Sequence, residues 1–215
     1  MKCYMCDNES TTEEHVPPAC FFPPGQKVNL ITVSSCTLHN LRKSKDDEYI
    51  RSIIAPSLGN NSFGLDMALT KVNRSFLHSK GLIAAVFKEA NAVRTGDGRE
   101  TVAITVNLNR WDEFFNHFSN AIYFHDFQTT HRKRWDIVTP SLKPDNSVLN
   151  GQLDPYREVN QKLSTMRFVE QKASNPKIFR YSLFRHSSES YAYKFVFYEG
   201  FVVCALSTPE ESTFP

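Results

Sequence analysis

Four residues that commonly bind metal ions stand in two short pairs near the beginning of this 215-residue chain. Cys3 and Cys6 form one pair, and Cys36 and His39 form a second pair with the same spacing. Thiolates and imidazoles make closed tetrahedral Zn²⁺ sites, and two ligands separated by two residues can reach one ion from a tight turn. The two pairs therefore predict a structural zinc site. On spacing alone, a purely structural zinc knuckle explains them as well as a functional site does.

A carboxylic acid, a histidine and an amide accompany these pairs. Glu14 and His15 stand between them, and Asn40 directly follows His39. Glu14 can hold a hard cation while His15 points the other way and deprotonates a water molecule. The amide oxygen of Asn40 would complete the cation site. Phosphodiester hydrolysis needs these parts, namely an activated water and a divalent ion on the scissile phosphate.

The segments within residues 1–55 predict how these side chains come together. Residues 11–16 are expected to form a strand that delivers His15 to its end, and the prolines that follow force a loop. The β-branched run over residues 28–33 predicts a second strand, and the apolar spacing over residues 36–54 predicts a helix. The expected order is knuckle, strand, loop, strand and helix. The acidic run 46–48 is interpreted as a solvated face of that helix.

A proline followed by small polar residues over 56–62 predicts a boundary, so we expect two domains, residues 1–55 and 56–215. In the second domain, apolar and polar residues alternate from Thr101 to Leu108, which predicts a strand. Asn109 is expected to cap the helix that follows. The apolar face of that helix comprises Trp111, Phe114, Phe115, Phe118 and Ile122.

The C-terminal part is expected to begin with a helix and end in strands. Asp154-Pro155 predicts the start of a helix that extends to about Gln171. Residues 178–184, 191–198 and 201–206 predict an antiparallel meander. The predicted fold class is α+β, with an N-terminal zinc-bound module followed by an α+β domain.

Composition narrows the classes of protein, the compartment and the cysteine chemistry that fit this chain. The net charge of +2 lacks the strongly basic balance that would by itself indicate a nucleic-acid-binding protein. No segment approaches the ~18 apolar residues of a membrane span, and the first residues lack the apolar region of a signal peptide. We therefore expect a cytoplasmic protein without membrane contact. In that reducing compartment the five cysteines favour metal binding over disulfides.

The segment from Cys3 to Tyr49 resembles the HNH, or ββα-metal, nuclease motif in the version braced by a zinc knuckle. The matching features, in chain order, are Cys3, Cys6, Glu14-His15-Val16-Pro17, Asn29-Leu30, Cys36, His39, Asn40 and Lys43. The stretches EHVPPACFFP and NLITVSSC further resemble a bacterial group of HNH proteins that carry an additional α+β domain. The motif covers about a quarter of the chain.

The resemblance implies a role for each matched residue. His15 would be the general base, and Glu14 and Asn40 would bind a catalytic Mg²⁺ or Mn²⁺ ion. Asn29 would orient the imidazole of His15 from the opposite strand. The zinc ligands would be Cys3, Cys6, Cys36 and His39. The chain departs from the family at His39, where a cysteine is usual, and at Glu14, where aspartate is commoner.

The function implied by the resemblance is a metal-dependent endonuclease that hydrolyses DNA, in the setting of restriction or phage defence. Residues 56–215 would then provide target recognition or oligomerisation, with a second copy or a defence protein as partner. The alternative is a catalytically idle, zinc-braced module that binds nucleic acid or protein. Dependence of any nuclease activity on added Mg²⁺ or Mn²⁺ separates these hypotheses.

Overall fold

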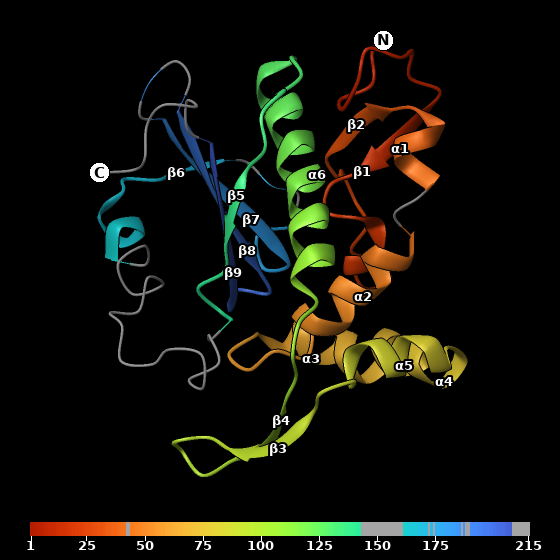
Figure 1. Cartoon of the computed structure of the whole chain (residues 1–215), viewed down its shortest axis with the longest axis vertical. Coiled ribbons are helices and arrows are strands. Elements are labelled where there is room, and N and C mark those ends of the chain that lie inside the picture. The colour runs from red at the N-terminus through yellow and green to blue at the C-terminus, as the bar shows by residue number, and fades with distance from the viewer. Residues whose placement is uncertain are drawn as a thin grey trace.

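The computed structural model describes residues 1–41, 44–142, 161–171, 173, 175–185, 187 and 190–207. Within them helices and strands are mixed, and every strand pair is antiparallel. The predicted α+β class is therefore confirmed. Figure 1 shows the long helix α6 standing between the N-terminal hairpin and the C-terminal sheet.

The N-terminal part has the expected order of strand, loop, strand and helix. Strand β1 (Thr12–His15) pairs with β2 (Thr32–Ser35), and the loop between them contains the short helix η1 (Ala19–Phe21). Helices α1 (Thr37–Leu41) and α2 (Ser44–Ile54) follow. Residues 42 and 43 lie outside the described residues, so Lys43 of the motif has no structural account.

The second strand begins later than its β-branched run predicts. Asn29 has a φ of 50°, which is the left-handed region and is incompatible with an extended strand. Pairing with the first strand starts only beyond it, where the N–H of Val16 donates to the carbonyl of Ile31 at 2.9 Å. A local turn at Asn29 therefore overrides the strand propensity of residues 28–31.

Short helices and a hairpin connect the two ends of the molecule. The helices are α3 (Ser62–Met67), η2 (Ala68–Val72), α4 (Asn73–His78) and α5 (Lys80–Val86), and the hairpin is β3 (Asn91–Arg94) with β4 (Glu100–Ala103). In Figure 1 the hairpin projects away from the other elements. The strand predicted to run to Leu108 ends at Ala103.

Helix α6 (Leu108–Phe127) is capped by Asn107, whose side chain accepts from the N–H of Arg110 at 3.2 Å. The predicted cap, Asn109, lies inside the helix instead. A side chain that precedes the first turn can reach its free N–H groups, whereas one within the turn cannot. The predicted apolar face is confirmed, because Trp111, Phe114, Phe115, Phe118 and Ile122 are buried.

The C-terminal sheet has five strands in the order β5-β9-β8-β7-β6. Their bounds are β5 (Asp136–Val138), β6 (Val169–Gln171), β7 (Phe179–Arg185), β8 (Tyr191–Phe197) and β9 (Phe201–Ser207). The predicted meander is confirmed as β7, β8 and β9. The prediction of a helix up to Gln171 is wrong at its C-terminal end, because Val169 pairs with Leu183 in the sheet. The predicted start of this helix, at Asp154-Pro155, lies outside the described residues. Sheet pairing supplies backbone partners that a sequence pattern does not reveal.

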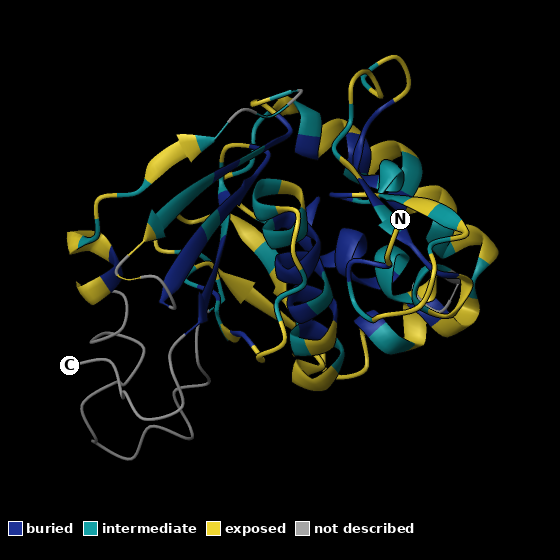
Figure 2. Ribbon diagram, turned by 90° about the horizontal axis from the view of Figure 1, so that it is seen from above, coloured by how far each residue is buried: buried dark blue, intermediate teal, exposed yellow. Residues whose placement is uncertain are grey.

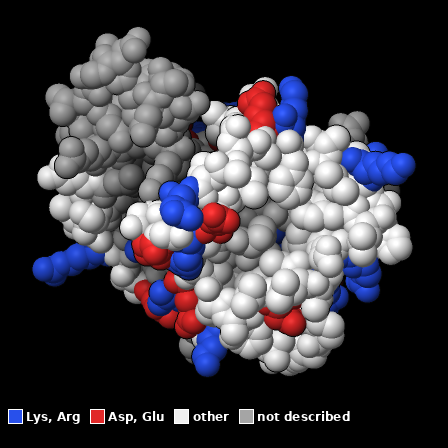
Figure 3. Space-filling model, turned by 90° about the horizontal axis from the view of Figure 1, so that it is seen from below, with Lys and Arg blue, Asp and Glu red and all other residues white. Residues whose placement is uncertain are grey.

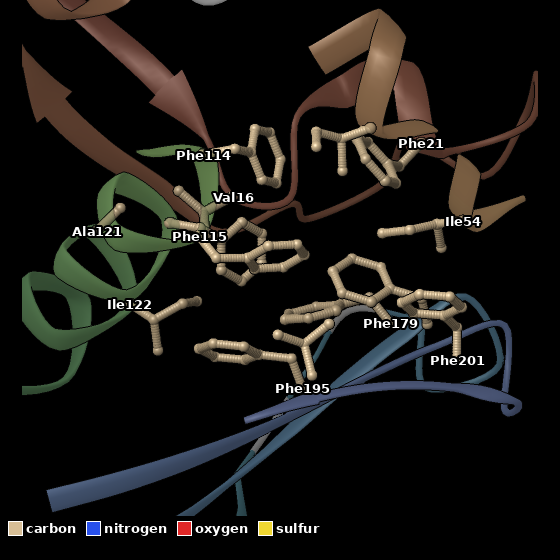
Figure 4. Packing of buried hydrophobic residues seen from close by; sticks show 14 of the residues in the cluster. Val16, Phe21, Ile54, Phe114, Phe115, Ala121, Ile122, Phe179, Phe195 and Phe201 are labelled. Atoms are coloured by element: carbon tan, nitrogen blue, oxygen red, sulfur yellow. The ribbon is translucent and has the colours of Figure 1, made fainter. Parts of the chain in front are cut away.

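One hydrophobic core crosses the predicted domain boundary. Phe21 of the N-terminal part lies 5.6 Å from Phe197 of the sheet, and Phe118 of α6 lies 4.9 Å from Phe195, both measured between ring centroids. Figure 4 shows the phenylalanines of α6 between these two layers, and Figure 2 shows that the central strands are buried. The division at residue 55 stays a prediction, but the two parts share their apolar interior.

The segment predicted to be the domain boundary, residues 56–62, packs against the sheet. Asn61 donates its N–H to the carbonyl of Tyr198 at 2.9 Å. A Cβ atom at Gly200 would lie 2.3 Å from the carbonyl oxygen of Gly59, so only glycine permits this approach. The start of the second part is thus held on the turn between β8 and β9.

Candidate metal centre and hydrolytic site

The four predicted zinc ligands converge on one point. The Nδ1 atom of His39 lies 3.2 Å from Cys36 Sγ and 3.6 Å from the Sγ atoms of both Cys3 and Cys6. Cys6 Sγ and Cys36 Sγ are 3.9 Å apart. A tetrahedral Zn²⁺ ion separates two sulfurs by about 3.8 Å, and a sulfur from a nitrogen by about 3.6 Å. The donor set and spacing therefore fit a metal ion and are compatible with structural zinc.

Backbone hydrogen bonds hold these ligands in place. In the first pair, the N–H of Cys3 donates to Asn8 O at 2.9 Å, and the N–H of Met5 donates to Cys3 Sγ at 3.5 Å. In the second pair, Cys36 directly follows β2, and the α1 turn places His39 beside it. A backbone hydrogen bond from His39 lowers the pKa of the Cys36 thiol, which favours the thiolate that binds metals.

Strand β1 sends Glu14 and His15 to opposite faces. Thr12 and Glu14 are half-buried, whereas Glu13 and His15 are exposed. This alternation follows from the strand geometry, in which successive side chains point to opposite sides. His15 is the last paired residue of β1, opposite Thr32. The predicted base is therefore open to solvent at the end of the hairpin.

A small cavity lies beside these two residues. Its polar wall comprises Glu14, His15 and Asp47, and Phe114 and Phe118 of α6 contribute to its apolar wall. The volume is about 10 Å³, which is enough for about one water molecule. Glu14, His15 and Asp47 thus border one cavity, although the side chains of Glu14 and His15 leave β1 on opposite faces, and Asp47 was not predicted to belong there.

Tyr4 connects the metal centre to this site. Its side chain is fully buried between Cys3 and Cys6 in the chain, and its N–H donates to Ser34 O at 2.9 Å. Burial raises the pKa of Tyr4 well above its usual value, and the charge of Glu14 and a hydrogen bond with Glu14 raise it further. The phenol therefore stays protonated and donates to the Glu14 carboxylate, so the metal-binding turn helps to orient the acid.

Asn40 lies against the same face of β1 as Glu14. Its Nδ2 atom donates to Thr12 Oγ1 at 3.0 Å and to Glu13 O at 3.3 Å. Thr12 and Glu14 are two positions apart, so the amide lies about 7 Å along the strand from the Glu14 position. Among the described residues, the zinc set alone forms a close group of Cys, His and acidic ligands. Glu14 and Asp47 do not form a second such group in this conformation.

Asn29 serves as a turn residue. It is exposed, and its left-handed conformation is one that asparagine tolerates better than most residues. Between the described residues Asn29 and His15, no hydrogen bond is formed. The orienting role implied by the family resemblance therefore has no contact to support it in this structure.

Asp47 is the residue that the sequence interpretation missed. Its neighbours do lie on a charged surface, since Asp46 bonds Arg110 at 2.6 Å and Glu48 lies 3.6 Å from Arg51. Asp47 instead turns one carboxylate oxygen into the protein interior. Helical spacing offered a signal, because residues 50 and 54, three and seven positions later, are buried isoleucines.

A polar groove of about 500 Å³ lies next to the metal centre. Its walls include Met5, which stands between the ligands Cys3 and Cys6, together with His117 of α6 and the run 131–134. The rings of His117 and His39 are 6.0 Å apart between centroids. Arg132 bonds Asp7 at 3.1 Å, and residues 132–134 are exposed basic side chains. The groove therefore brings three basic residues and the acid Glu113 close to the metal centre.

Comparisons with protein-family models, curated proteins and solved structures gave no match. Among the helices in the described part of the chain, none is long and apolar enough to cross a membrane.

Proposed function

We propose that this protein is a metal-dependent endonuclease of the HNH type that hydrolyses DNA phosphodiester bonds. The observation that carries the proposal is the position of His15, exposed at the end of β1 beside the half-buried Glu14, in a hairpin joined to its following helix by four converging metal ligands. This arrangement matches the strand, loop, strand and helix order that the family resemblance implies.

The chemistry assigns a separate task to each group. His15 would accept the proton of the attacking water, and its exposure leaves room for a phosphodiester to approach. Glu14 and Asn40 have the oxygen atoms that Mg²⁺ or Mn²⁺ prefers. Because they lie about 7 Å apart along β1, one ion would reach both only after a side chain moves, and that ion would stabilise charge on the scissile phosphate. A zinc ion held by these four protein ligands would have no open coordination position, so its role would be structural.

The polar groove beside the metal centre supports a nucleic-acid substrate. Phosphate contacts from Lys and Arg provide most of the sequence-independent affinity for DNA. Residues 132–134 present such cations within reach of α6, the helix that also lines the His15 cavity. The bound backbone would then run across the metal-braced end of the molecule toward His15.

Nicking of supercoiled plasmid, with and without Mg²⁺ or Mn²⁺, tests the proposal. His15→Ala is expected to lower the nicking rate at least ~100-fold, the usual minimum contribution of a general base. His78→Ala is the matched control, because His78 is also exposed but lies on α4. Cleavage by His15→Ala at the wild-type rate, or cleavage that chelation of divalent ions leaves unchanged, would refute the mechanism.

A second candidate is a catalytically idle, zinc-braced module that binds nucleic acid or protein. It is favoured by the engagement of Glu14 with Tyr4 and by a cavity with room for about one water. This function predicts DNA retardation on a gel without cleavage in any divalent ion. Metal-dependent nicking would exclude it.

A further inference from the structure

Three cationic side chains lie close together beside the loop between β1 and β2. They are Lys27 of that loop, Lys71 of η2 and Arg74 of α4, and we call them the cation triad. Among the described residues, none of the three forms a salt bridge. On the face shown in Figure 3, by contrast, several Lys and Arg side chains lie beside Asp or Glu. The triad is thus a patch of positive charge without paired acids.

The fold holds Lys71 against the loop that contains Lys27. The Lys71 ammonium group donates to the carbonyl of Phe22 at 2.6 Å. Next to Lys27, the Oε1 atom of Gln26 accepts from Asn175 Nδ2 at 2.6 Å, which fixes this end of the loop. An ammonium group has three donors, so the bond to Phe22 leaves Lys71 with two N–H groups for a further acceptor.

Lys71 and Arg74 stand three positions apart in a continuous helical run. Helices α3, η2 and α4 follow one another without a break, and η2 is a π-helix. Side chains three positions apart are neighbours on a helix surface, and π turns occur frequently at functional sites. Burial lowers the pKa of Lys71, and the charges of Lys27, Arg51 and Arg74 lower it further. These three cations therefore lie close enough to Lys71 to repel its charge.

Arg51 adds a fixed positive charge in the interior beside the triad. It is 6% exposed, and its Nη2 atom donates at 2.7 Å to the hydroxyl of Ser75, the residue after Arg74. Among the described residues, its buried Nε atom has no hydrogen-bond partner. Glu48 lies 3.6 Å from Arg51 and balances this one charge, which leaves the triad unpaired. A bound anion would relieve the repulsion among these cations.

Cys20 lies near both this cluster and the cavity beside His15. Burial raises the pKa of its thiol to about 11. The charge of Asp47, which lines the His15 cavity, raises this pKa further, whereas the charges of Arg51 and Lys71 lower it. Helix η1, which contains Cys20, packs against α2. The triad therefore lies next to the candidate hydrolytic site, beside the loop that begins directly after His15.

We propose that the cation triad binds the phosphate backbone of a nucleic acid beside the His15 cavity. Phosphates carry one negative charge each, and their contacts with Lys and Arg give affinity without sequence preference. The groove beside the metal centre and the His15 cavity are lined by different residues of α6, so the triad would add a backbone contact on the cavity side. The proposal rests on the proposed nuclease function for the role of the bound backbone, which the triad would hold while His15 faces the scissile phosphate.

Titration of a fluorescently labelled DNA duplex into the full chain, at several salt concentrations and without added Mg²⁺ or Mn²⁺, tests this proposal. Each of Lys27→Gln, Lys71→Gln and Arg74→Gln is expected to weaken binding and to reduce the slope of log affinity against log salt by about one unit. Lys71→Arg keeps the charge and is expected to keep the slope. Lys27 and Arg74 are exposed, so their replacement leaves the fold intact, and thermal unfolding of all variants checks this.

Lys162→Gln is the matched control and is expected to bind like the wild type. Lys162 is also exposed, but its neighbour Leu163 packs on Cys204, whose side chain lies on the face of the sheet away from α6. A wild type that binds no duplex, or triad variants that keep the wild-type slope, would overturn the proposal. Binding of phosphatidylserine vesicles in place of DNA would overturn it as well. Triad-dependent binding without any nicking would support the proposal and refute the nuclease function alone, because binding and cleavage are measured separately.

Discussion

Replacement of Cys36 by serine is expected to release the metal ion and destabilise the N-terminal part. The Cys36 thiol is buried and lies closest to His39 Nδ1, at 3.2 Å. A serine hydroxyl is not ionised near neutral pH and is a poor zinc ligand, so the site keeps three effective ligands. The turn that carries Tyr4, and through it the orientation of Glu14, then loses its anchor.

The expected fall in Tm follows from the affinity lost when one of the four ligands is removed. Loss of a group that only supports a zinc ligand costs about 10–100-fold in affinity, so loss of a direct ligand costs at least ~100-fold. That factor corresponds to about 2.7 kcal/mol. For a chain of this size, 1 kcal/mol lowers Tm by about 2–4 °C, so the variant is expected to melt about 5–11 °C below the wild type.

Cys20→Ser provides the matched control. Burial raises the pKa of the Cys20 thiol to about 11, so this thiol remains protonated and does not belong to the metal set. Elemental analysis should find one zinc per chain in the wild type and in Cys20→Ser, and much less in Cys36→Ser. A chelator should lower the wild-type Tm toward that of Cys36→Ser. Full zinc content in Cys36→Ser, or an unchanged Tm, would refute the assigned ligand set.

Three further predictions follow from the site. Asp47→Asn removes a carboxylate from the cavity beside His15 and is expected to slow plasmid nicking about 10–100-fold, whereas Asp46→Asn should not; equal rates would exclude a role for the buried acid. Replacement of residues 132–134 by glutamine should reduce the slope of log affinity against log salt by roughly three units in DNA-binding titrations, and an unchanged slope would exclude this groove. Burial lowers the pKa of His131 from 6.5, so the unfolded chain binds the proton more readily and stability should fall as pH drops through 6.5. Urea unfolding at about pH 7.5 and about pH 5.5 should show this decrease, and His131→Gln should reduce it.

The fold follows from local patterns only where neighbours in the chain determine the structure. The meander of β7, β8 and β9 was predictable because alternating strands are separated by short turns. Strand β6 was not, because its pairing with β7 is a contact that the pattern of residues 169–171 does not specify. Asn29 likewise shows that a single left-handed residue can end a strand that β-propensity would extend.

Zinc-ligand spacing and residue type were enough to predict that Cys3, Cys6, Cys36 and His39 meet, since each pair lies within one turn and a single ion could bind both pairs. The exposure of His15 and the inward direction of Glu14 also follow from alternation along a short strand. Only the tertiary structure decided that Asp47 joins them, because the side of α2 that is buried depends on where α6 packs. The shared core of α6, the hairpin and the sheet was equally beyond a sequence pattern, since burial depends on which surfaces meet and not on the residues of one segment.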